Sequence, residues 1–409
     1  MPKTFSEKTF APAVIKTGDT LIAAMCKAAA GREWGYIEIV TSVSNDGGAS
    51  WSEEQTVIAP PARAISSDIE NTKSAFFTKP TLTLANDGTV LLLVTFFPES
   101  KGTADMKYLE KKKTAFTSFD GVKCPIIYDK EGNYYIVWEN GCVIDKRKAQ
   151  TAFYIEDFGE LYKDDEYMGN IYLNGAQGKS ENGGKTTFGS HFKASKRSYI
   201  FLLKSDDNGQ SWSRPVDITP SILNENDTAY IGTCGGTGIT TKDGRIIIPM
   251  VSDKGNFCIY SDDNGSTWCR NQRQPYTGTD GEWTLFEVPN GHLYGYAKSK
   301  ALLSADRGIL WLKGDKPGIK LPKQQKATAV SGDTLLLAYP NGTGKGGRIC
   351  TAAFEYDKRQ AFKGIRWSKE AATVTDGAFS APCLAVLDDS TAALLYETDS
   401  GVRFDTVTL

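Results

Sequence analysis

The sequence lacks any apolar run close to the roughly 20 residues that a membrane-spanning helix needs. It also lacks an excess of charge of either sign, because 47 basic and 49 acidic side chains leave a net charge of −2 over 409 residues. This balance provides no polybasic field for nucleic acid or anionic lipid. We therefore predict no nucleic-acid partner and no membrane span, and the opening residues, MPKTFSEKTF, contain no signal-peptide core.

Metal-binding patterns are missing as well. The eight cysteines include no C-x-x-C pair, and the only two histidines, His191 and His292, lie far apart in the chain. Zinc sites are built from cysteines and histidines at close spacings, so we predict no metal site and no cofactor. Cys258 and Cys269 flank an expected hairpin and could either face each other as a disulfide or remain free thiols.

Short runs of β-branched and aromatic residues fill most of the chain, among them TLTLANDGTVLLLVTF, GRIIIPMV and TAALLYE. Clusters of Asp, Asn and Gly separate these runs, as turns separate strands. Long amphipathic helical patterns are absent, and 40 glycines suit the tight turns that many short strands require. The sequence therefore predicts an all-β fold.

One pattern, Ser-x-Asp-x-Gly-x-x-Trp, recurs at residues 44–51, 205–212, 261–268 and 304–311. In each copy the Asp carboxylate can accept backbone N–H bonds across a tight turn, the Gly permits a positive φ, and the Trp can cover the base of a hairpin. We interpret each copy as a structural turn and not as a ligand site. Identical hairpins at wide spacing indicate sheets that repeat radially.

These copies match the Asp-boxes, or BNR repeats, of the sialidase (neuraminidase) family, and the chain resembles bacterial and trypanosomal sialidases over essentially its whole length. The resemblance implies a six-bladed β-propeller with a small inserted β subdomain. It implies that the boxes lie at the blade periphery, away from the sugar site. It also implies a glycan or glycoconjugate ligand and an extracytoplasmic or secreted location. We expect the chain to be a monomer.

The spacing of the boxes locates the insertion. Boxes two, three and four follow one another at about the length of one blade, whereas the stretch between boxes one and two is too long for two further blades. Part of that stretch, ending in YMGNIYL, is similar to the insertion that some bacterial sialidases carry. We predict the first part of the propeller over 1–107, the insertion over 108–173 and the remainder of the propeller over 174–409.

The resemblance also implies a specific set of site residues. Retaining sialidases hold the substrate carboxylate with three arginines, and they use a tyrosine nucleophile activated by a Glu, with an Asp as acid/base. At the first two arginine motifs this chain has Phe10 and Phe257, which carry no charge. The third motif matches GTGKGGRIC and places Lys345 or, after a small slip, Arg348 at the arginine. Both could equally be ordinary loop and strand-edge charges.

The tyrosine nucleophile is missing from the matching segment. This segment reads GAFSAPCL and has Ala381 in the place of the tyrosine. Alanine has no hydroxyl, so no covalent glycosyl–enzyme can form at this residue. Two carboxylates persist, because Glu38 matches the acid/base Asp and Glu282 matches the Glu that activates the tyrosine. We take both as candidate catalytic residues.

The candidate substrate-binding side chains are Lys27, Trp34, Lys79, Lys345 and Arg348. Lys27 and Lys79 match a pocket Arg and a pocket Asp of the family, and Trp34 could stack on a sugar ring. A structural interpretation stays open beside this one. The two candidate carboxylates could be surface groups or ion-pair partners of these lysines, and Trp34 could be propeller core.

Three functions fit these residues. In the first, the chain is a sialidase-like propeller that lacks the retaining chemistry and binds or recognises glycans, which the loss of the nucleophile and two arginines favours. In the second, it is a glycoside hydrolase of altered specificity that uses Glu38 and Glu282 as acid and base. In the third, the pocket is vestigial and the protein has a structural or interaction role. An active exo-α-sialidase stays open if the nucleophile is misaligned.

Overall fold

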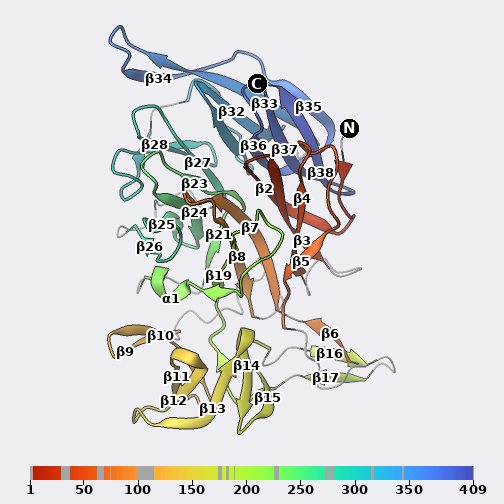
Figure 1. Ribbon diagram of the computed structural model, residues 1–409, viewed down its shortest axis with the longest axis vertical. Helices are drawn as coiled ribbons and strands as arrows, with labels where there is room; N and C mark the ends of the chain where they lie inside the picture. The colour runs from red at the N-terminus through yellow and green to blue at the C-terminus, as the bar shows by residue number, and fades with distance from the viewer. Residues whose placement is uncertain are drawn as a thin grey trace.

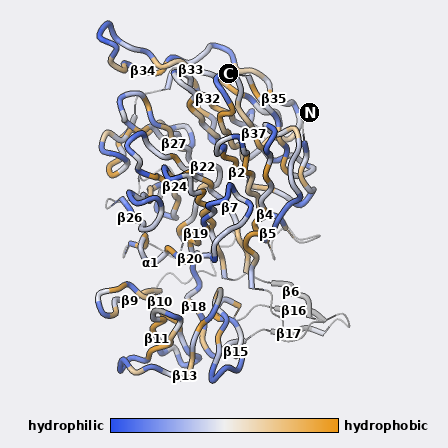
Figure 2. The backbone as a smooth tube through the Cα atoms, viewed as in Figure 1, coloured by the Kyte–Doolittle hydropathy of each residue, from blue (hydrophilic) through white to orange (hydrophobic). Residues whose placement is uncertain are grey.

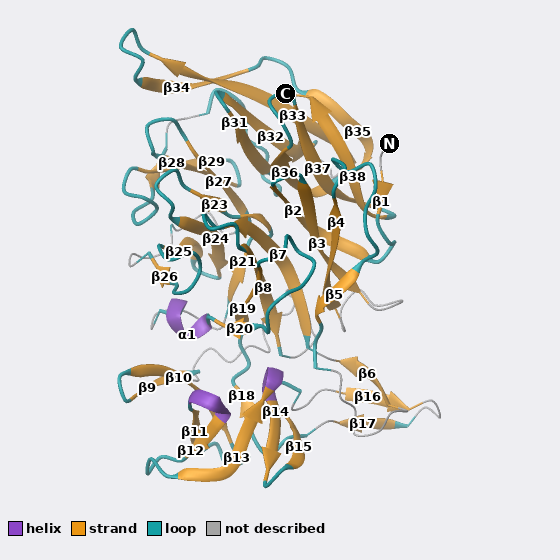
Figure 3. Ribbon diagram, viewed as in Figure 1, coloured by secondary structure: helices purple, strands orange, loops and turns teal. Residues whose placement is uncertain are grey.

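The computed structural model describes residues 3–28, 37–61, 69–73, 75–98, 115–173, 177–180, 184–187, 189–224, 230–271, 276, 281–314, 317–342 and 345–408. Strands dominate these residues, and the short α1 (Thr219–Ile222) is their only α-helix. Figure 1 shows a large group of sheets with a smaller group of strands below it, and Figure 3 shows how completely strands make up both. The all-β prediction is confirmed.

Six sheets form the blades of the predicted six-bladed β-propeller. From the innermost strand outwards, blade 1 contains β2 (Thr9–Thr17), β3 (Thr20–Ala28), β4 (Ile37–Ser44) and β5 (Gln55–Ile58). Blade 2 contains β7 (Phe76–Leu84), β8 (Val90–Phe97), β19 (Tyr199–Ser205) and β20 (Val216–Asp217). Blade 3 contains β21 (Ile231–Thr233), β24 (Ile246–Ser252), β25 (Gly255–Ser261) and β26 (Cys269–Arg270). Blade 4 contains β27 (Trp283–Glu287), β28 (Leu293–Ala297), β29 (Lys300–Ser304) and β30 (Leu312–Lys313). Blade 5 contains β31 (Ala327–Ser331), β32 (Thr334–Pro340), β33 (Lys345–Tyr356) and β34 (Phe362–Trp367). Blade 6 contains β36 (Ser380–Val386), β37 (Thr391–Thr398), β38 (Gly401–Thr408) and β1 (Lys3–Thr4).

Short additional strands join these blades. The strand β22 (Gly236–Thr237) pairs in parallel with β7, β23 (Ile239–Thr240) pairs with β24, and β35 (Ala372–Ala378) pairs with β33. The link through β22 ties blade 3 to blade 2 beside the propeller axis. Apolar side chains fill the space between the blades, and all eight residues of β8 are buried. Figure 2 shows this as hydrophobic colour along the strands of the blades.

Strand β1 closes the ring by pairing with the last strand of the chain. Lys3 lies opposite Phe404 in β38, and the Phe5 N–H donates to the Val402 carbonyl at 2.8 Å. The Phe5 ring is 5% exposed and meets the Trp51 ring edge-on, with 5.2 Å between the centroids. Blades 6 and 1 therefore share a small aromatic core at the closure.

Between β8 and β19 the chain leaves blade 2 and builds a separate sheet, drawn below the propeller in Figure 1. Its strands are β9 (Phe116–Phe119), β10 (Val122–Tyr128), β11 (Tyr134–Val137), β12 (Cys142–Ile144), β13 (Gln150–Glu156), β14 (Glu160–Lys163), β15 (Glu166–Asn170) and β18 (Lys193–Ala194). A three-stranded ribbon combines β6 (Ile69–Lys73), β16 (Gln177–Ser180) and β17 (Lys185–Thr187). We call the sheet from β9 to β18 the insertion. The boundaries at 108 and 173 stay a prediction, and residues 108–114 lie outside the described residues.

Each Asp-box forms the turn between the third and fourth strands of a blade. In the box at 261–268, Ser261 Oγ donates to Asp263 Oδ1 at 2.7 Å and accepts the Gly265 N–H at 2.8 Å. The Asp263 carboxylate also accepts the Thr267 N–H at 2.8 Å and the Thr267 hydroxyl at 2.6 Å. Gly265 has φ of 76°, and the Trp268 side chain is 4% exposed. These contacts fit the structural interpretation of the boxes.

The cysteines of the described residues are free thiols. Cys269 lies opposite Tyr260 across β25 and β26, so it does not face Cys258. The disulfide left open by the sequence is therefore not formed. None of the described helices has the length and apolarity that crossing a membrane would take.

Candidate functional site

Three innermost strands carry a bulge near their beginning. The register of β2, β7 and β36 shifts at these bulges, and each holds a residue with positive φ: Ala11 at 49°, Lys79 at 54° and Ala381 at 44°. Each of these residues precedes a proline. A positive φ is uncommon for residues other than glycine, and a bulge changes the direction in which side chains point. Three neighbouring blades thus share a bulge with a positive φ near the start of the innermost strand.

The bulge on β7 brings Lys79 to a carboxylate of another blade. Lys79 Nζ forms an ion pair with Glu282, which directly precedes β27 of blade 4. Their side chains are 21% and 30% exposed. Burial acts to lower the pKa of Lys79, but the charges of Tyr230 and Glu282 outweigh it and raise that pKa. Burial acts to raise the pKa of Glu282, and the Lys79 charge outweighs it, so that pKa is lowered.

A second lysine lies beside this pair and was missed by sequence reasoning. Lys326 directly precedes β31 of blade 5, is 3% exposed, and has a buried Nζ with no hydrogen-bond partner among the described residues. Burial lowers its pKa to about 8, although the charge of Glu282 acts in the opposite direction. The only available signal was a lysine at the start of an apolar strand, KATAV, which also suits a surface position.

Two groups near the Lys79–Glu282 pair, the Cys234 thiol and the Tyr230 hydroxyl, have raised pKa values. Burial raises the pKa of the Cys234 thiol to about 12, so the reactive thiolate is scarce at neutral pH. Burial also raises the pKa of Tyr230, whose ring stacks on Phe97. Gln325 Nε2 donates to the Cys234 carbonyl at 3.3 Å and thereby joins blade 5 to blade 3.

Blade 1 holds three more of the predicted residues. Lys27 on β3 lies directly opposite Glu38 on β4, but Lys27 Nζ forms its ion pair with Glu54 Oε2 at 2.9 Å. Glu38 is half-buried and has no hydrogen bond or ion pair among the described residues. Trp34 lies outside the described residues, so its predicted stacking role stays a prediction.

Blades 5 and 6 hold the remaining predicted residues. Lys345 is the first residue of β33, lies opposite Ala378 and is exposed. Arg348 is half-buried, with its Nη1 3.6 Å from Asp376 Oδ1. On β36, Ala381 is 9% exposed. The structure therefore brings Lys79 and Glu282 into contact, places Lys27 opposite Glu38, and leaves Lys345 and Arg348 along β33.

The residue matched to the second family arginine lies in the core between two blades. Phe257, matched to the second arginine, is fully buried on β25 in the core with Leu91 and Leu93 of blade 2. The Arg270 guanidinium lies over its ring, 3.8 Å from the centroid. Phe257 thus contributes to packing between blades 2 and 3 and not to the Lys79–Glu282 cluster.

The cluster of Lys79, Lys326 and Glu282 combines two amines with one carboxylate. Such an arrangement can bind an oxygen-rich or anionic group, because charge-assisted hydrogen bonds to oxygen acceptors are strong. The described residues contain no group of three or more His, Cys, Asp or Glu side chains that could hold a metal ion.

A sequence profile described as the BNR repeat-like domain matches residues 11–280. An anhydrosialidase of Macrobdella decora is 26% identical over 417 aligned positions, which cover 88% of this chain and 53% of that protein. A sialidase of Paraclostridium sordellii is 25% identical, with 90% of this chain and 93% of that protein covered. The chain therefore spans about half the length of the first relative and nearly all of the second.

Solved structures show the same architecture. The intramolecular trans-sialidase from Ruminococcus gnavus, solved with oseltamivir carboxylate, is similar with a TM-score of 0.80 at 20% identity, covering 100% of this chain and 97% of that one. A leech intramolecular trans-sialidase has a TM-score of 0.78 at 22% identity, covering 99% of this chain and 68% of that one. These likenesses establish a sialidase-like propeller fold. Since the profile covers well over half of its residues, the chain belongs to the BNR repeat-like domain family.

Proposed function

We propose that this sialidase-like propeller recognises a glycan through the cluster around Lys79 and Glu282 and does not carry out retaining sialidase hydrolysis. The ion pair between these two side chains is the observation that carries the proposal. The retaining mechanism of sialidases requires a tyrosine nucleophile, and the resemblance assigns its activation to a Glu. Here the matching carboxylate is held by an ammonium group, and the resemblance assigns Ala381 to the tyrosine position.

The charges of the cluster support a ligand that offers oxygen acceptors. Lys326 is buried without a hydrogen-bond partner among the described residues. A buried polar group of this kind costs free energy unless it finds a partner. Because Lys79 already neutralises Glu282, the Lys326 amine is available to donate a hydrogen bond to a ligand oxygen. A glycan with an acidic group supplies such an oxygen and matches the positive charge.

A second candidate function, a glycoside hydrolase of altered specificity, is favoured by Glu38. This carboxylate is half-buried and has no ion pair among the described residues, since Lys27 pairs with Glu54. A carboxyl group without a counter-ion could serve as a general acid. In this reaction Glu282 would have to release Lys79 to act as the base, which makes this the weaker of the two candidates.

Hydrolysis and binding assays on the same preparation separate the candidates. A fluorogenic sialoside and a panel of neutral aryl glycosides are incubated with the wild type at high concentration, with Ala381→Tyr beside it. We expect no turnover by the wild type and retention of glycans on an array, lost in Lys79→Gln but kept in the exposed control Lys323→Gln. Sialoside turnover would restore an exo-α-sialidase, and neutral glycoside turnover abolished by Glu38→Gln would establish the altered hydrolase.

A further inference from the structure

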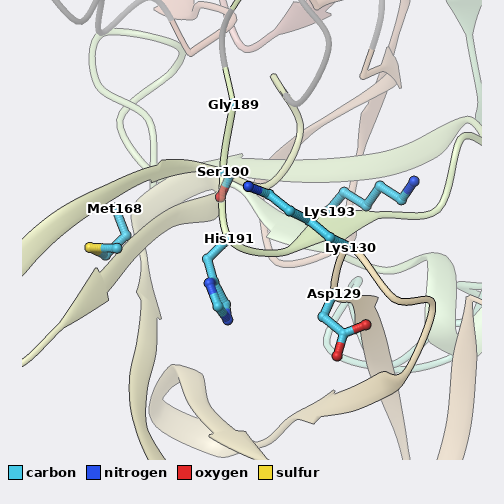
Figure 4. Close-up of a pocket in the computed structure, with 7 residues that line it drawn as sticks. All are labelled: Asp129, Lys130, Met168, Gly189, Ser190, His191 and Lys193. Atoms are coloured by element: carbon cyan, nitrogen blue, oxygen red, sulfur yellow. The ribbon is translucent and has the colours of Figure 1, made fainter.

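The insertion contains a hollow of about 440 Å³ that is separate from the Lys79–Glu282 cluster. Its lining comes from three segments, the turn that follows β10, the strand β15, and residues 189–193 (Figure 4). Gly169 on β15 runs so close to this last segment that a Cβ there would lie 2.5 Å from the Gly189 carbonyl oxygen. The close backbone contact fixes the floor of the hollow.

The polar lining of the hollow has an excess of cationic and donor groups. Its single carboxylate, Asp129, is already engaged, because Oδ1 accepts the Asn133 N–H at 2.7 Å and Oδ2 accepts Asn133 Nδ2 at 2.9 Å. Lys130, Lys193 and His191 also line the hollow, and their side chains have no hydrogen bond or ion pair to any described residue. Three side chains that can donate therefore line the hollow, and its one carboxylate is already hydrogen-bonded.

One side of the hollow is aromatic and apolar. The His191 ring stacks on Phe153, with 4.7 Å between the centroids and 16° between the planes, and it meets Phe192 edge-on. Met168 from β15 adds a half-buried thioether next to them. Packing on these two rings holds the imidazole in place, so His191 and Met168 give the hollow an apolar side.

We propose that this hollow is a second glycan-binding site, specific for a saccharide unit that carries an acidic group. The anionic group would bind the ammonium groups of Lys130 and Lys193 by charge-assisted hydrogen bonds. The apolar C–H face of the sugar ring would lie on the His191 ring, which Phe153 supports from behind, as aromatic side chains offer a large apolar surface. The volume lies within the ordinary range of about 300–1,000 Å³ for small-ligand sites.

Calorimetric titration of the full chain with glucuronate tests this site, with glucose and inorganic sulfate as reference probes. We expect glucuronate to bind more tightly than either probe, because glucose lacks the anion and sulfate lacks the ring. The double variant Lys130→Gln/Lys193→Gln should weaken glucuronate binding at least tenfold. The matched control Lys320→Gln/Lys323→Gln removes two exposed charges from the propeller and should bind as the wild type does.

Titration of Lys79→Gln separates this site from the propeller cluster. Glucuronate binding that persists in Lys79→Gln and is lost in the double variant supports the insertion site, whatever the fate of the proposed function. Binding of sulfate as tight as glucuronate, or equal weakening by both double variants, would overturn it. Binding lost in Lys79→Gln and kept in Lys130→Gln/Lys193→Gln would overturn it as well. All these lysine substitutions are at exposed or half-buried positions, so circular dichroism should report a native fold.

Discussion

At the scale of single residues, Lys326 is a buried charge that should lower the stability of the fold. Its ammonium is removed from water and has no hydrogen-bond acceptor among the described residues, while Lys79 already occupies Glu282. Replacing a buried charge by an apolar side chain of similar size is often neutral or stabilising. Replacing Lys326 should therefore raise the stability of the protein while weakening ligand binding.

We expect Lys326→Met to raise the free energy of unfolding at pH 7 by about 2 kcal/mol. The pKa of Lys326 falls from 10.5 to about 8 on folding. Between these values the unfolded chain holds more protons than the folded one, so wild-type stability should rise with pH across that window. The variant should lose this rise. Urea unfolding at pH 7 and at pH 9.5 measures both effects.

The exposed Lys323, three residues earlier, provides the matched control. Lys323→Met should change stability by no more than about 0.5 kcal/mol at either pH, as is usual for surface positions. If Lys326→Met destabilised the fold at pH 7, the amine would have an acceptor, and the argument that it awaits a ligand oxygen would fail.

At the scale of elements, the Asp-box turns are the most self-contained units of the blades. Each box serine hydroxyl bridges the box aspartate and a glycine N–H, as at Ser44, Ser205, Ser261 and Ser304. The fourth box differs at Leu310, which supplies its N–H but no hydroxyl. These bonds are local, which explains why the boxes could be interpreted from the sequence.

We expect Asp263→Ala to lower the free energy of unfolding by about 1–2 kcal/mol, because three hydrogen bonds to an exposed carboxylate are lost. Burial acts to raise the pKa of Asp263, but the bonds from Thr267 and Ser261 outweigh it and lower the pKa from 3.8 to about 2. The stabilisation is therefore present above pH 3.8 and is lost as the pH falls towards 2. Urea unfolding at pH 7 and pH 2 measures the difference.

Asp19 in the turn between β2 and β3 is the control, because it is exposed and has no hydrogen bond among the described residues. Asp19→Ala should leave stability within about 0.5 kcal/mol of the wild type. A loss in Asp263→Ala no larger than in this control would show that the box turn holds without its carboxylate.

At the scale of the whole molecule, closure of the ring depends on β1, which is only two residues long and pairs with β38. Such a short ladder supplies few hydrogen bonds, so side-chain packing must hold the two ends together. The Phe5 ring supplies that packing with Trp51, whose ring also meets Phe404 at 5.3 Å between centroids.

We expect Phe5→Ala to lower the free energy of unfolding by about 3 kcal/mol, the lower end of the range for buried phenylalanines. Phe5→Leu should lose less than half as much, because leucine still fills most of the space. Thermal and urea unfolding measure both, with Val122→Ala, at a 46% exposed position, as the control. If Phe5→Ala were as stable as the control, the packing of Phe5 on Trp51 would not be what holds the two ends of the ring together.

Local patterns made much of the fold predictable. Alternating strand and turn residues indicated an all-β chain, and the repeated boxes, through their resemblance to sialidases, indicated six blades. The site was less predictable. Lys79 and Glu282 were selected by motif matching, whereas Lys326 has no motif.

The sequence by itself determined the elements whose contacts lie within a few residues, namely the box turns and the strands around them. Tertiary structure alone decided which charges meet, because Lys79, Glu282 and Lys326 come from three blades and are far apart in the chain. An ion pair depends on the distance between the two groups and on their burial. The sequence shows neither quantity for residues that come together only when the ring closes. The same holds for the hollow of the insertion, where β15 and residues 189–193 come together only after the sheet has folded.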